Sequence, residues 1–571
     1  MNKIILERDL IGLKPLFYCT KPEFAFASEK KELERKGFID IIELDPRKIL
    51  IYDDGKIDFK EKKFFGIKPE IKDNEGKIKE KVKELLIKAV KKRISDEKLG
   101  ILFSGGVDST TLLQICKDLG KEVVLYTAAV VDKERKMPED LVYAEKAAEK
   151  YGVKLRVNKI GIGEVEKYLK KIVPIIEDND PVKIGVGLTL YLACELAKED
   201  GCKAVFSGLG SEEIFAGYER HRLSKDANKE CVNGLLKMYE RDLYRDNMVT
   251  KYNNLELGVP FLDEELIEYC LRIPAGYKLD KEYSKVILRK VAEELGVPKE
   301  FAWRKKRAAQ YGSHSHKALQ KLVKRNGFER ISDYLRTFYT GHDIRLAALY
   351  SSGKDSNYAL WLMQKQNYDV SCLVTVRSKN KDSYMYHTPN IEMTELQSEA
   401  IGIPLITVET EGEKEKELED LEKGLNEAKK KYKIDGVITG ALYSNYQRER
   451  IEKVCDKLGL KVFSPLWHAN QELELREIIR NGFRVILTAI AAEGLDKTWL
   501  GRVLTEKDVD RLVELEKKIG LNVAGEGGEY ESLVLNGPNF SKQIEIEKSK
   551  TVEENKNTAK LIIEKAKLIS L

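Results

Sequence analysis

Two short segments of the chain carry serine, glycine and aspartate in an order that suits phosphate binding. Residues 104–109 read Ser-Gly-Gly-Val-Asp-Ser, and residues 351–356 read Ser-Ser-Gly-Lys-Asp-Ser. Each follows a short apolar run and precedes a stretch with helical periodicity, so we expect each to turn from a strand into a helix. Such a turn presents backbone N–H groups at the positive end of the helix dipole, and serine hydroxyls add donors. The two segments therefore predict two sites for a pyrophosphate group.

Both loops resemble the pyrophosphate loop of the ATP pyrophosphatase superfamily, whose members split ATP between the α and β phosphates. The sequence has no Gly-x-x-x-x-Gly-Lys-Ser/Thr motif, which disfavours chemistry at the γ phosphate. The resemblance implies adenylation: a substrate carboxylate attacks the α phosphate, pyrophosphate leaves, and ammonia then displaces AMP. We expect ATP and Mg²⁺ as cofactors, with Asp108 and Asp355, one turn into each helix, holding the metal. Lys354 lies within the second loop and is expected to act on the phosphates.

Parallel strands followed by helices must carry these loops. Strand-like runs such as 99–103 and 204–206 alternate with long amphipathic stretches, which is typical of a parallel α/β sheet. Beyond each loop, a later strand again ends in a small residue and a glycine, so the chain is expected to carry one nucleotide-binding architecture twice. The residues expected to bind ATP are Ser104, Gly105, Gly106, Asp108, Ser109, Ser207, Gly208, Ser351, Gly353, Asp355, Ser356, Thr439 and Gly440.

Composition restricts the remaining classes of function. The 571 residues suggest three or four folding units at roughly 150 residues each. Lys plus Arg (100) nearly balances Asp plus Glu (95), so the net charge by itself gives no argument for a nucleic-acid partner, and we do not expect one. No stretch approaches the ~20 apolar residues of a membrane span, and the amino terminus lacks a secretory pattern, so we expect a cytoplasmic protein without a membrane partner. The eight cysteines are scattered without a Cys-x-x-Cys pair, which predicts buried free thiols.

The first 330 or so residues resemble the asparagine synthetase family. The motifs that carry the resemblance are residues 104–109, residues 207–218, residues 259–263, Lys285-x-x-Leu288-Arg289 and Trp303-Arg304-Lys305-Lys306. The resemblance implies that Lys306 stabilises negative charge on the α phosphate. It also implies that Asp108 and Glu212 hold magnesium.

Three residues depart from the pattern of that family. Leu209 stands where the family has a glutamate, and it can neither bind ammonia nor take a proton, which argues against asparagine formation. Glu212 stands where an aspartate is usual, and the carboxylate survives. Gly258 stands where an arginine is usual, which removes a substrate clamp.

Residues 1–67 look β-rich and resemble the late part of the class II glutaminase domain of that family. The matching motifs are Arg8-Asp9-x-x-Gly12-x-Lys14-Pro15-Leu16-x-Tyr18 and Ala27-Ser28-Glu29-Lys30. In the family, the nucleophilic cysteine and the glutamine-binding segments precede these motifs. Cys19 lies inside a strand pattern and is no substitute. We therefore expect a truncated glutaminase remnant without glutamine hydrolysis.

Residues 344–571 resemble the diphthine-ammonia ligase family, which completes the modified histidine of elongation factor 2. The motifs that carry the resemblance are residues 351–360, 382–390, 440–441, 444–448, 465–467, 500–502 and 525–532. The resemblance implies elongation factor 2 in its diphthine form and ammonia as partners. Within the loop, Ser352 replaces the first of the two glycines usual in the family and adds a side chain where the backbone approaches phosphate.

The segment 525–532, Gly-Glu-Gly-Gly-Glu-Tyr-Glu-Ser, carries three carboxylates around its glycines. Such an acidic loop suits a cationic substrate, ammonia or magnesium. The residues expected to be catalytic are Lys306, Lys354, Glu526, Glu529 and Glu531. The trimethylammonium group of diphthine could face an aromatic ring, with core packing as the alternative for Tyr384, Tyr386, Tyr446, Trp467 and Tyr530. His387 is either a proton relay or a structural histidine.

The predicted fold class is α/β, with two adenine nucleotide alpha hydrolase-like parallel sheets preceded by a small β-rich glutaminase remnant. The expected domains are the remnant (1–67), an asparagine synthetase-like domain (68–330), a linker (331–343) and a diphthine-ammonia ligase-like domain (344–571).

The leading hypothesis is an ATP-dependent, AMP-forming amide ligase that converts diphthine to diphthamide with ammonia. Three alternatives remain open. The first half could amidate or cyclise another carboxylic acid, with Lys306 as its charge stabiliser. The chain could modify tRNA, although it lacks a Cys-x-x-Cys pair and a basic tail. The first half could instead be a non-catalytic scaffold that recruits a separate glutaminase.

Overall fold

The computed structural model describes most of the chain, in two compact units. The described residues are 3–38, 41–65, 70–131, 137–224, 226–236, 238–305, 313–328, 330–338, 344–365, 368–378, 390–412, 416–440, 445–466 and 470–571. Unit 1 comprises residues 1–341 and unit 2 comprises residues 342–571. Lys306, Tyr384, Tyr386, His387 and Trp467 lie outside the described residues, as does the side chain of Tyr446.

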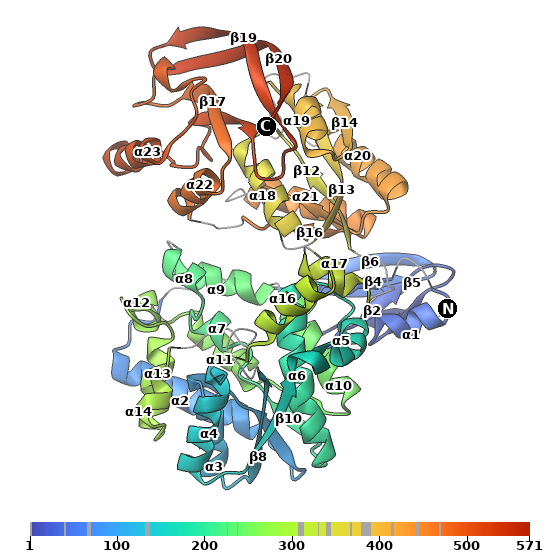
Figure 1. Ribbon diagram of the computed structural model, residues 1–571, viewed down its shortest axis with the longest axis vertical. Helices are drawn as coiled ribbons and strands as arrows, with labels where there is room; N and C mark the ends of the chain where they lie inside the picture. Colours follow the sequence, from blue (N-terminus) through green and yellow to red (C-terminus); the bar gives the residue numbers. More distant parts are fainter. Residues whose placement is uncertain are drawn as a thin grey trace. The chain divides into compact units, whose positions relative to one another are not determined.

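A five-stranded parallel sheet forms the centre of unit 1 (Figure 1). Its strands, in spatial order, are β11 (Glu256–Gly258), β10 (Ala204–Phe206), β7 (Leu99–Leu102), β8 (Val123–Val131) and β9 (Leu155–Gly161). From β7 the chain builds outward through β8 and β9, and it then returns to place β10 on the other side of β7. The winding therefore reverses between β7 and β10. In doubly wound sheets, ligands bind beyond the carboxyl ends of the strands at such a reversal.

Both faces of this sheet are covered by helices because both faces are apolar. Leu125 of β8 packs in one buried cluster with side chains of α2, α3 and α4, whereas Tyr126 and Ala128 pack in another with side chains of α5 and α6. The long helices are α2 (Glu75–Lys91), α3 (Val107–Asp118), α4 (Glu139–Tyr151), α5 (Ile162–Ile176) and α6 (Pro181–Glu199). The remaining helices are α7 (Ser211–Ile214), α8 (Glu219–Leu223), α9 (Ala227–Leu236), α10 (Tyr244–Tyr252), α11 (Glu264–Cys270), α12 (Ala275–Lys278), α13 (Val286–Glu294), α14 (Lys299–Ala302), α16 (Ser315–Arg325) and α17 (Ile331–Arg336), with the π-helix η1 (Tyr239–Leu243) and the 3₁₀ helix η2 (Pro260–Leu262).

Two small antiparallel sheets precede this domain within unit 1. One contains β1 (Ile4–Leu6), β5 (Lys48–Asp53) and β6 (Lys56–Glu61), and the other contains β3 (Ala25–Ala27), β2 (Phe17–Cys19) and β4 (Ile42–Glu43); α1 (Lys30–Arg35) follows β3. The Arg8 guanidinium donates to the carbonyls of Gly12 (2.9 Å) and Leu44 (2.7 Å), and it lies over the Tyr239 ring. The Arg-Asp motif therefore holds this segment together and against η1. Cys19 lies buried in β2, where burial raises the pKa of its thiol.

Unit 2 repeats the parallel sheet of unit 1 with the same winding. Its strands, in spatial order, are β14 (Leu405–Thr410), β13 (Asp369–Ser378), β12 (Arg345–Leu349), β15 (Gly436–Ile438) and β16 (Lys461–Phe463). In each unit the first strand in sequence lies in the middle and the fourth lies beside it. The reversal therefore falls between β12 and β15. The helices associated with this part are α18 (Lys354–Lys365), α19 (Met393–Ile401), α20 (Lys416–Tyr432), α21 (Asn445–Leu458) and α22 (Gln471–Arg480).

A second, four-stranded antiparallel sheet ends unit 2. Its strands, in spatial order, are β18 (Tyr530–Asn536), β17 (Arg484–Ala491), β20 (Thr558–Ser570) and β19 (Lys542–Asn555); the 3₁₀ helix η3 (Lys497–Trp499) and α23 (Glu506–Ile519) lie between β17 and β18 in sequence. The long hairpin β19–β20 carries ion pairs across its two strands, such as Lys565–Glu547 (2.8 Å) and Lys548–Glu564 (2.7 Å). β19 is the outer strand of this sheet.

The α/β fold class with two parallel sheets is confirmed. All eight cysteines lie in the described part of the chain and are buried and free, as expected from their scatter. Within the described residues, the helices are all too short or too polar to cross a lipid bilayer.

Candidate functional site

The first predicted loop lies where β7 meets α3, at the reversal of the unit 1 sheet. Gly106 is the N-cap of α3, and Gly105 has a φ of +68°, a conformation that favours glycine. A Cβ atom on Gly105 would come within 2.7 Å of the Tyr143 backbone carbon. The Ser109 hydroxyl donates to the Gly106 carbonyl (3.3 Å) and accepts from the Ser104 amide (3.4 Å). The loop is therefore fixed by its own serine.

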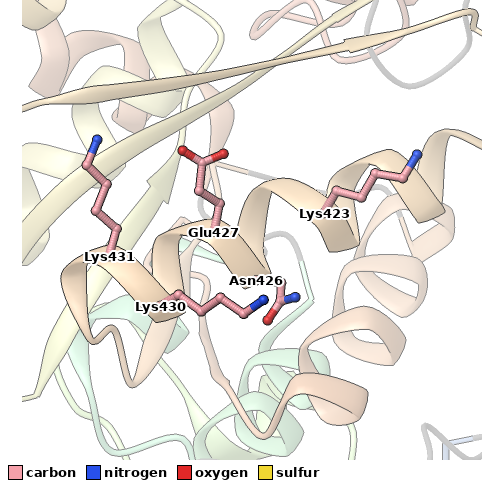
Figure 2. A pocket seen from close by; sticks show the side chains of 5 residues that line it. All are labelled: Lys423, Asn426, Glu427, Lys430 and Lys431. Carbon is pink, nitrogen blue, oxygen red and sulfur yellow. The ribbon is translucent and has the colours of Figure 1, made fainter.

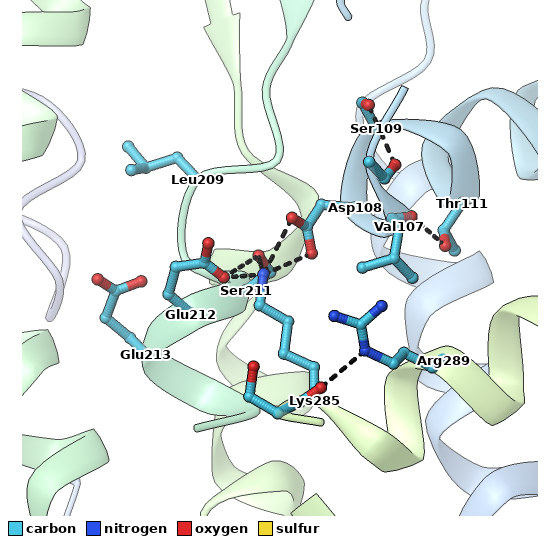
Figure 3. Close-up of polar contacts among 12 residues, drawn as sticks. Val107, Asp108, Ser109, Thr111, Leu209, Ser211, Glu212, Glu213, Lys285 and Arg289 are labelled. Carbon is cyan, nitrogen blue, oxygen red and sulfur yellow. Dashed lines mark hydrogen bonds and ion pairs between the residues drawn. The ribbon is translucent and has the colours of Figure 1, made fainter. Parts of the chain in front are cut away.

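A buried lysine joins the two loops of unit 1 (Figure 3). The Lys285 ammonium donates to both carboxylate oxygens of Asp108, at 2.8 and 2.9 Å, and to the Ser211 hydroxyl at 3.0 Å. It also forms an ion pair with Glu212. A Cβ on Gly208 would lie 2.8 Å from the Asp108 Cβ, so only glycine lets the second loop come this close. The structure thus brings Asp108 and Glu212 together, and their oxygens are the donor type that Mg²⁺ prefers.

Two arginines from the predicted motifs, Arg289 and Arg304, hold the backbone at and near this loop by hydrogen bonds. The Arg304 guanidinium donates to the Ser104 carbonyl and to Asp140, both at 2.6 Å, and it lies 4.2 Å from the centre of the Tyr143 ring. The Arg289 guanidinium donates to the carbonyl of Arg304 at 3.0 Å. These arginines therefore position backbone. Whether the neighbouring Lys306 reaches a phosphate stays a prediction.

The structure shows what surrounds Leu209 and Gly258, two of the residues that depart from the asparagine synthetase pattern. Leu209 follows the β10 loop and supplies no polar side chain to it. Gly258 lies in β11 beside β10, and a Cβ there would come within 2.5 Å of the Phe206 ring. Because Phe206 fills that space, an arginine at this position would require β10 to change as well.

The second predicted loop has the same internal bonds as the first. The Ser351 amide donates to the Ser356 hydroxyl (3.3 Å), which donates to the Gly353 carbonyl (3.2 Å). Ser352 has a φ of +70°, close to that of Gly105 in the first loop. A Cβ on Gly440 would lie 2.9 Å from the backbone of Asp355, so the strand end after β15 also packs directly on this loop. Each unit therefore pairs a first-strand loop with a fourth-strand glycine, as the sequence predicted.

Lys354 is the buried cation of the second loop. Its ammonium donates to Asp355 at 2.6 Å and lies 6.0 Å from the centre of the Tyr530 ring. Burial alone would lower its pKa, but the neighbouring Asp355 carboxylate, with Tyr530 and more distant carboxylates, raises the pKa of Lys354 above its ordinary value. The lysine therefore remains charged within the serine-glycine loop.

The three glutamates of segment 525–532 differ in burial and in hydrogen bonding. Burial, with a contribution from Asp355 and against Lys354, raises the pKa of Glu531 to about 7. Glu526 is exposed, and its charge acts on Lys354. Glu529 accepts from the amides of Asn522 (3.1 Å) and Gly527 (2.8 Å), so it holds the turn of the loop. The structure groups Glu526 and Glu531 around Lys354 and ties Glu529 to backbone.

Tyr530 is the one proposed cage aromatic whose side chain the structure describes. It is buried, and its hydroxyl donates to the Val523 carbonyl at 2.6 Å. Its ring belongs to the main buried cluster of unit 2. Core packing is thus the reading that its contacts favour.

Sequence reasoning missed two buried charged residues of these sites. Lys285 was noted within a motif but given no role, and its burial beside Asp108 could not be seen from spacing. Glu474, on α22, is buried and faces Asp355, although its surrounding sequence reads as an ordinary amphipathic helix. The spacing of apolar residues around Glu474 therefore does not predict that this carboxylate is buried. Ser532, expected only as part of a motif, accepts from the Lys354 amide at 3.1 Å and ties the acidic segment to the loop.

A surface depression lies on α20, away from both loops in the sequence (Figure 2). The side chains that line it are Lys423, Asn426, Glu427, Lys430 and Lys431. All of these belong to one helix, whereas the two loops combine residues from several elements. The candidate sites are therefore the loops at the sheet reversals.

Two doubly wound sheets, each with a serine-glycine loop and a lysine–aspartate pair at its reversal, define an α/β protein with two candidate ligand sites. The asparagine synthase family model matches residues 81–229 and 222–375. The model of the diphthamide synthase N-terminal domain matches residues 344–462, and that of its C-terminal domain matches residues 470–569. The chain belongs to the asparagine synthase family and, through its second unit, to the diphthine-ammonia ligase family.

Individual relatives divide in the same way. A putative glutamine-hydrolysing asparagine synthetase of Methanocaldococcus jannaschii is 36% identical over 400 residues, covering 58% of this chain and 71% of the relative. The diphthine-ammonia ligase of Mus musculus is 38% identical over 231 residues, covering 37% of this chain and 85% of the relative. Among solved structures, NMN synthetase from Francisella tularensis is 11% identical with a TM-score of 0.25, over 46% of this chain and 87% of its own. Both family resemblances predicted from the motifs are confirmed.

Proposed function

We propose that unit 2 is an ATP-dependent, AMP-forming ligase that converts the diphthine carboxylate of elongation factor 2 to the amide of diphthamide, with ammonia as the nitrogen donor. The observation that carries the proposal is the buried Lys354–Asp355 pair within the serine-glycine loop. The relatives of this unit are named diphthine-ammonia ligases, which supports the choice of substrate. Because elongation factor 2 works in the cytoplasm, we propose that the chain acts there.

The residues of the loop suit the first half of this reaction. A carboxylate oxygen of diphthine bonds to the α phosphorus of ATP, and the bond from that phosphorus to the bridging oxygen breaks, which releases pyrophosphate. The loop amides and Ser351 and Ser356 bind the phosphates, and Lys354 balances their charge. Mg²⁺, held by Asp355, would neutralise further charge on the phosphates.

The acidic segment suits the second half. The nitrogen of ammonia attacks the acyl carbon, the bond to the AMP oxygen breaks, and the nitrogen loses a proton. Glu531, with a pKa of about 7, is the carboxyl best suited to accept that proton near neutral pH. Glu526 lies exposed on the same segment and would attract ammonium or the trimethylammonium group. Glu529 keeps the turn in shape.

The direct test incubates the full chain with ATP, Mg²⁺, ammonium and elongation factor 2 that carries diphthine. AMP release and the mass change of a carboxyl becoming an amide are the expected results. Asp355→Asn should abolish both. Asp369→Asn, which alters a half-exposed aspartate of β13, is the matched control and should leave both unchanged. AMP release without amide, or turnover that survives Asp355→Asn, would reject the proposal.

A second candidate function belongs to unit 1, which could adenylate a different small carboxylic acid. The Lys285–Asp108–Glu212 cluster favours it, because a cation and two carboxylates meet at the loop just as in unit 2. Lys306 would stabilise the α phosphate, and either free ammonia or a separate glutaminase would supply the nitrogen. If Asp108→Asn abolishes turnover of elongation factor 2 while Asp355→Asn spares it, unit 1 carries the chemistry. If the protein with Asp108→Asn keeps full ligase activity and still binds a glutaminase, unit 1 is a scaffold.

A further inference from the structure

Glu474 is a buried carboxyl group that faces the carboxyl group of Asp355. It lies in the first turns of α22, its residue is 4% exposed, and neither of its carboxylate oxygens accepts a hydrogen bond. Burying a carboxylate in this way costs several kcal/mol unless a charge of opposite sign compensates it. Either a proton or a cation must therefore compensate this carboxylate.

A side-chain hydrogen bond between α18 and α22 helps to place Glu474 near the phosphate loop. The Tyr358 hydroxyl on α18 donates to Glu477 on α22 at 2.8 Å. Residues three apart lie on the same face of a helix, so Asp355 and Tyr358 share a face of α18, and Glu474 and Glu477 share a face of α22. The Tyr358–Glu477 bond thus holds Glu474 opposite Asp355, and these two carboxyl groups are close enough to interact directly.

The charges around Glu474 balance only if the pair of carboxyl groups binds a proton or a further cation. Lys354 contributes one positive charge, and it already donates to Asp355 at 2.6 Å. Asp355 and Glu474 contribute two carboxylates, and the nearby Glu526 contributes a third. Two carboxylates in contact either share a proton or bind a cation between them. Within the described residues, no group of three or more His, Cys, Asp or Glu could hold a metal, so an ion here would have two carboxylate ligands. Mg²⁺ is commonly held by one or two carboxylates together with the phosphates of a nucleotide.

We propose that Glu474 is a second carboxylate ligand, with Asp355, for the divalent cation that accompanies a nucleotide at the loop of unit 2. The proposal rests on the proposed function only in taking a nucleotide as the source of the phosphates. Glu474 then acts through the cation. It adds nothing to phosphate binding when the cation is absent, and it strengthens that binding when the cation is present.

The test measures the affinity of the full chain for α,β-methylene-ATP by calorimetry, in Mg²⁺ and in EDTA. Every protein carries Asp108→Asn, so that the corresponding carboxylate of unit 1 is absent. In EDTA, Glu474→Leu should bind the analogue as well as the protein that keeps Glu474, and it should lose roughly tenfold or more of the gain in affinity that Mg²⁺ gives. Glu474→Gln, which keeps the shape, should do the same. Glu472→Gln, on the outer side of α22 and paired with Arg476, is the matched control and should leave both affinities unchanged.

Affinities that fall together in Mg²⁺ and in EDTA would assign Glu474 a purely structural role and overturn the proposal. An unchanged gain from Mg²⁺ would overturn it as well, and would leave a shared proton as the compensation for the carboxylate pair. Ligase turnover is measured separately on the chain without any substitution. If the binding test shows the Glu474-dependent Mg²⁺ effect but the unsubstituted chain makes no diphthamide, the proposed function is refuted and this site stands.

Discussion

Ser352 occupies a position that suits glycine, and replacing it should stabilise unit 2. Its φ of +70° is left-handed, its side chain is fully buried, and its hydroxyl has no hydrogen-bond partner in the described structure. Its backbone carbonyl is well used, because it accepts from Gln397, Asn357 and the Val534 amide. Ser352→Gly keeps these backbone bonds and removes the strained and unpaired side chain.

The expected gain follows from three contributions. Relief of the left-handed conformation is worth about 1–2 kcal/mol. The larger backbone entropy of glycine in the unfolded chain offsets about 0.5–1 kcal/mol of this. Removal of a buried, unpaired hydroxyl adds up to about 1 kcal/mol. Ser352→Gly should therefore stabilise unit 2 by about 1–2 kcal/mol, and Ser352→Ala, which keeps the strain, by no more than about 1 kcal/mol.

Hydrogen exchange read by mass spectrometry can measure each unit separately. Amides of β12 should exchange about 5–30-fold more slowly in Ser352→Gly, whereas those of β7 should not change. The mirror variant Gly105→Ser places a Cβ against the Tyr143 backbone and should speed exchange in β7 alone. Faster exchange of β12 in Ser352→Gly, or no difference between the glycine and alanine variants, would show that the strain is not where the structure places it.

Three further predictions concern buried ionisable groups. Burial raises the pKa of Glu531 from 4.5 to about 7, so between these pH values the folded chain keeps a proton that the unfolded chain has lost. Unit 2 should therefore lose up to ~3 kcal/mol of stability as the pH rises from 4.5 to 7. In denaturant titrations at different pH values, Glu531→Gln should flatten that decline. A decline that is unchanged in Glu531→Gln would contradict this. Lys285→Met leaves Asp108 and Glu212 without their cation, so unit 1 should be destabilised by roughly 3 kcal/mol by hydrogen exchange, and equal stability would refute the ion cluster. Cys19 should resist iodoacetamide in the folded chain, since burial raises its pKa; rapid labelling would contradict its place in β2.

The duplicated architecture could be predicted because its signals are local. A strand that stops at Ser-Gly-Gly and a helix that follows are encoded within a dozen residues, and the second copy at 351–356 repeats them. The spatial order of the strands could be expected only in outline, because β10 and β15 pair with strands about a hundred residues earlier, and those long-range pairings have no local signature.

The candidate sites were predicted where chemistry lies in a motif and missed where it comes from packing. Asp108 and Asp355 follow from the loops themselves. Lys285 and Glu474 reach these aspartates from α13's N-cap position and from α22, and only tertiary packing decides which side of such an element faces the loop. Glu529 was expected to act with its neighbours because composition cannot distinguish a reacting carboxylate from one that caps backbone amides.

The ion-paired hairpin of unit 2 bears on how the protein behaves at high concentration. An edge strand such as β19 presents unpaired backbone N–H and C=O groups, and two molecules could pair their sheets along such an edge. Its alternating lysines and glutamates are already satisfied by β20, so a second copy of the strand would have to displace those partners or set like charges against each other. These charges should therefore keep the long hairpin from pairing with a second molecule. Acetylation of its lysines, which removes their charge, should promote that pairing and aggregation.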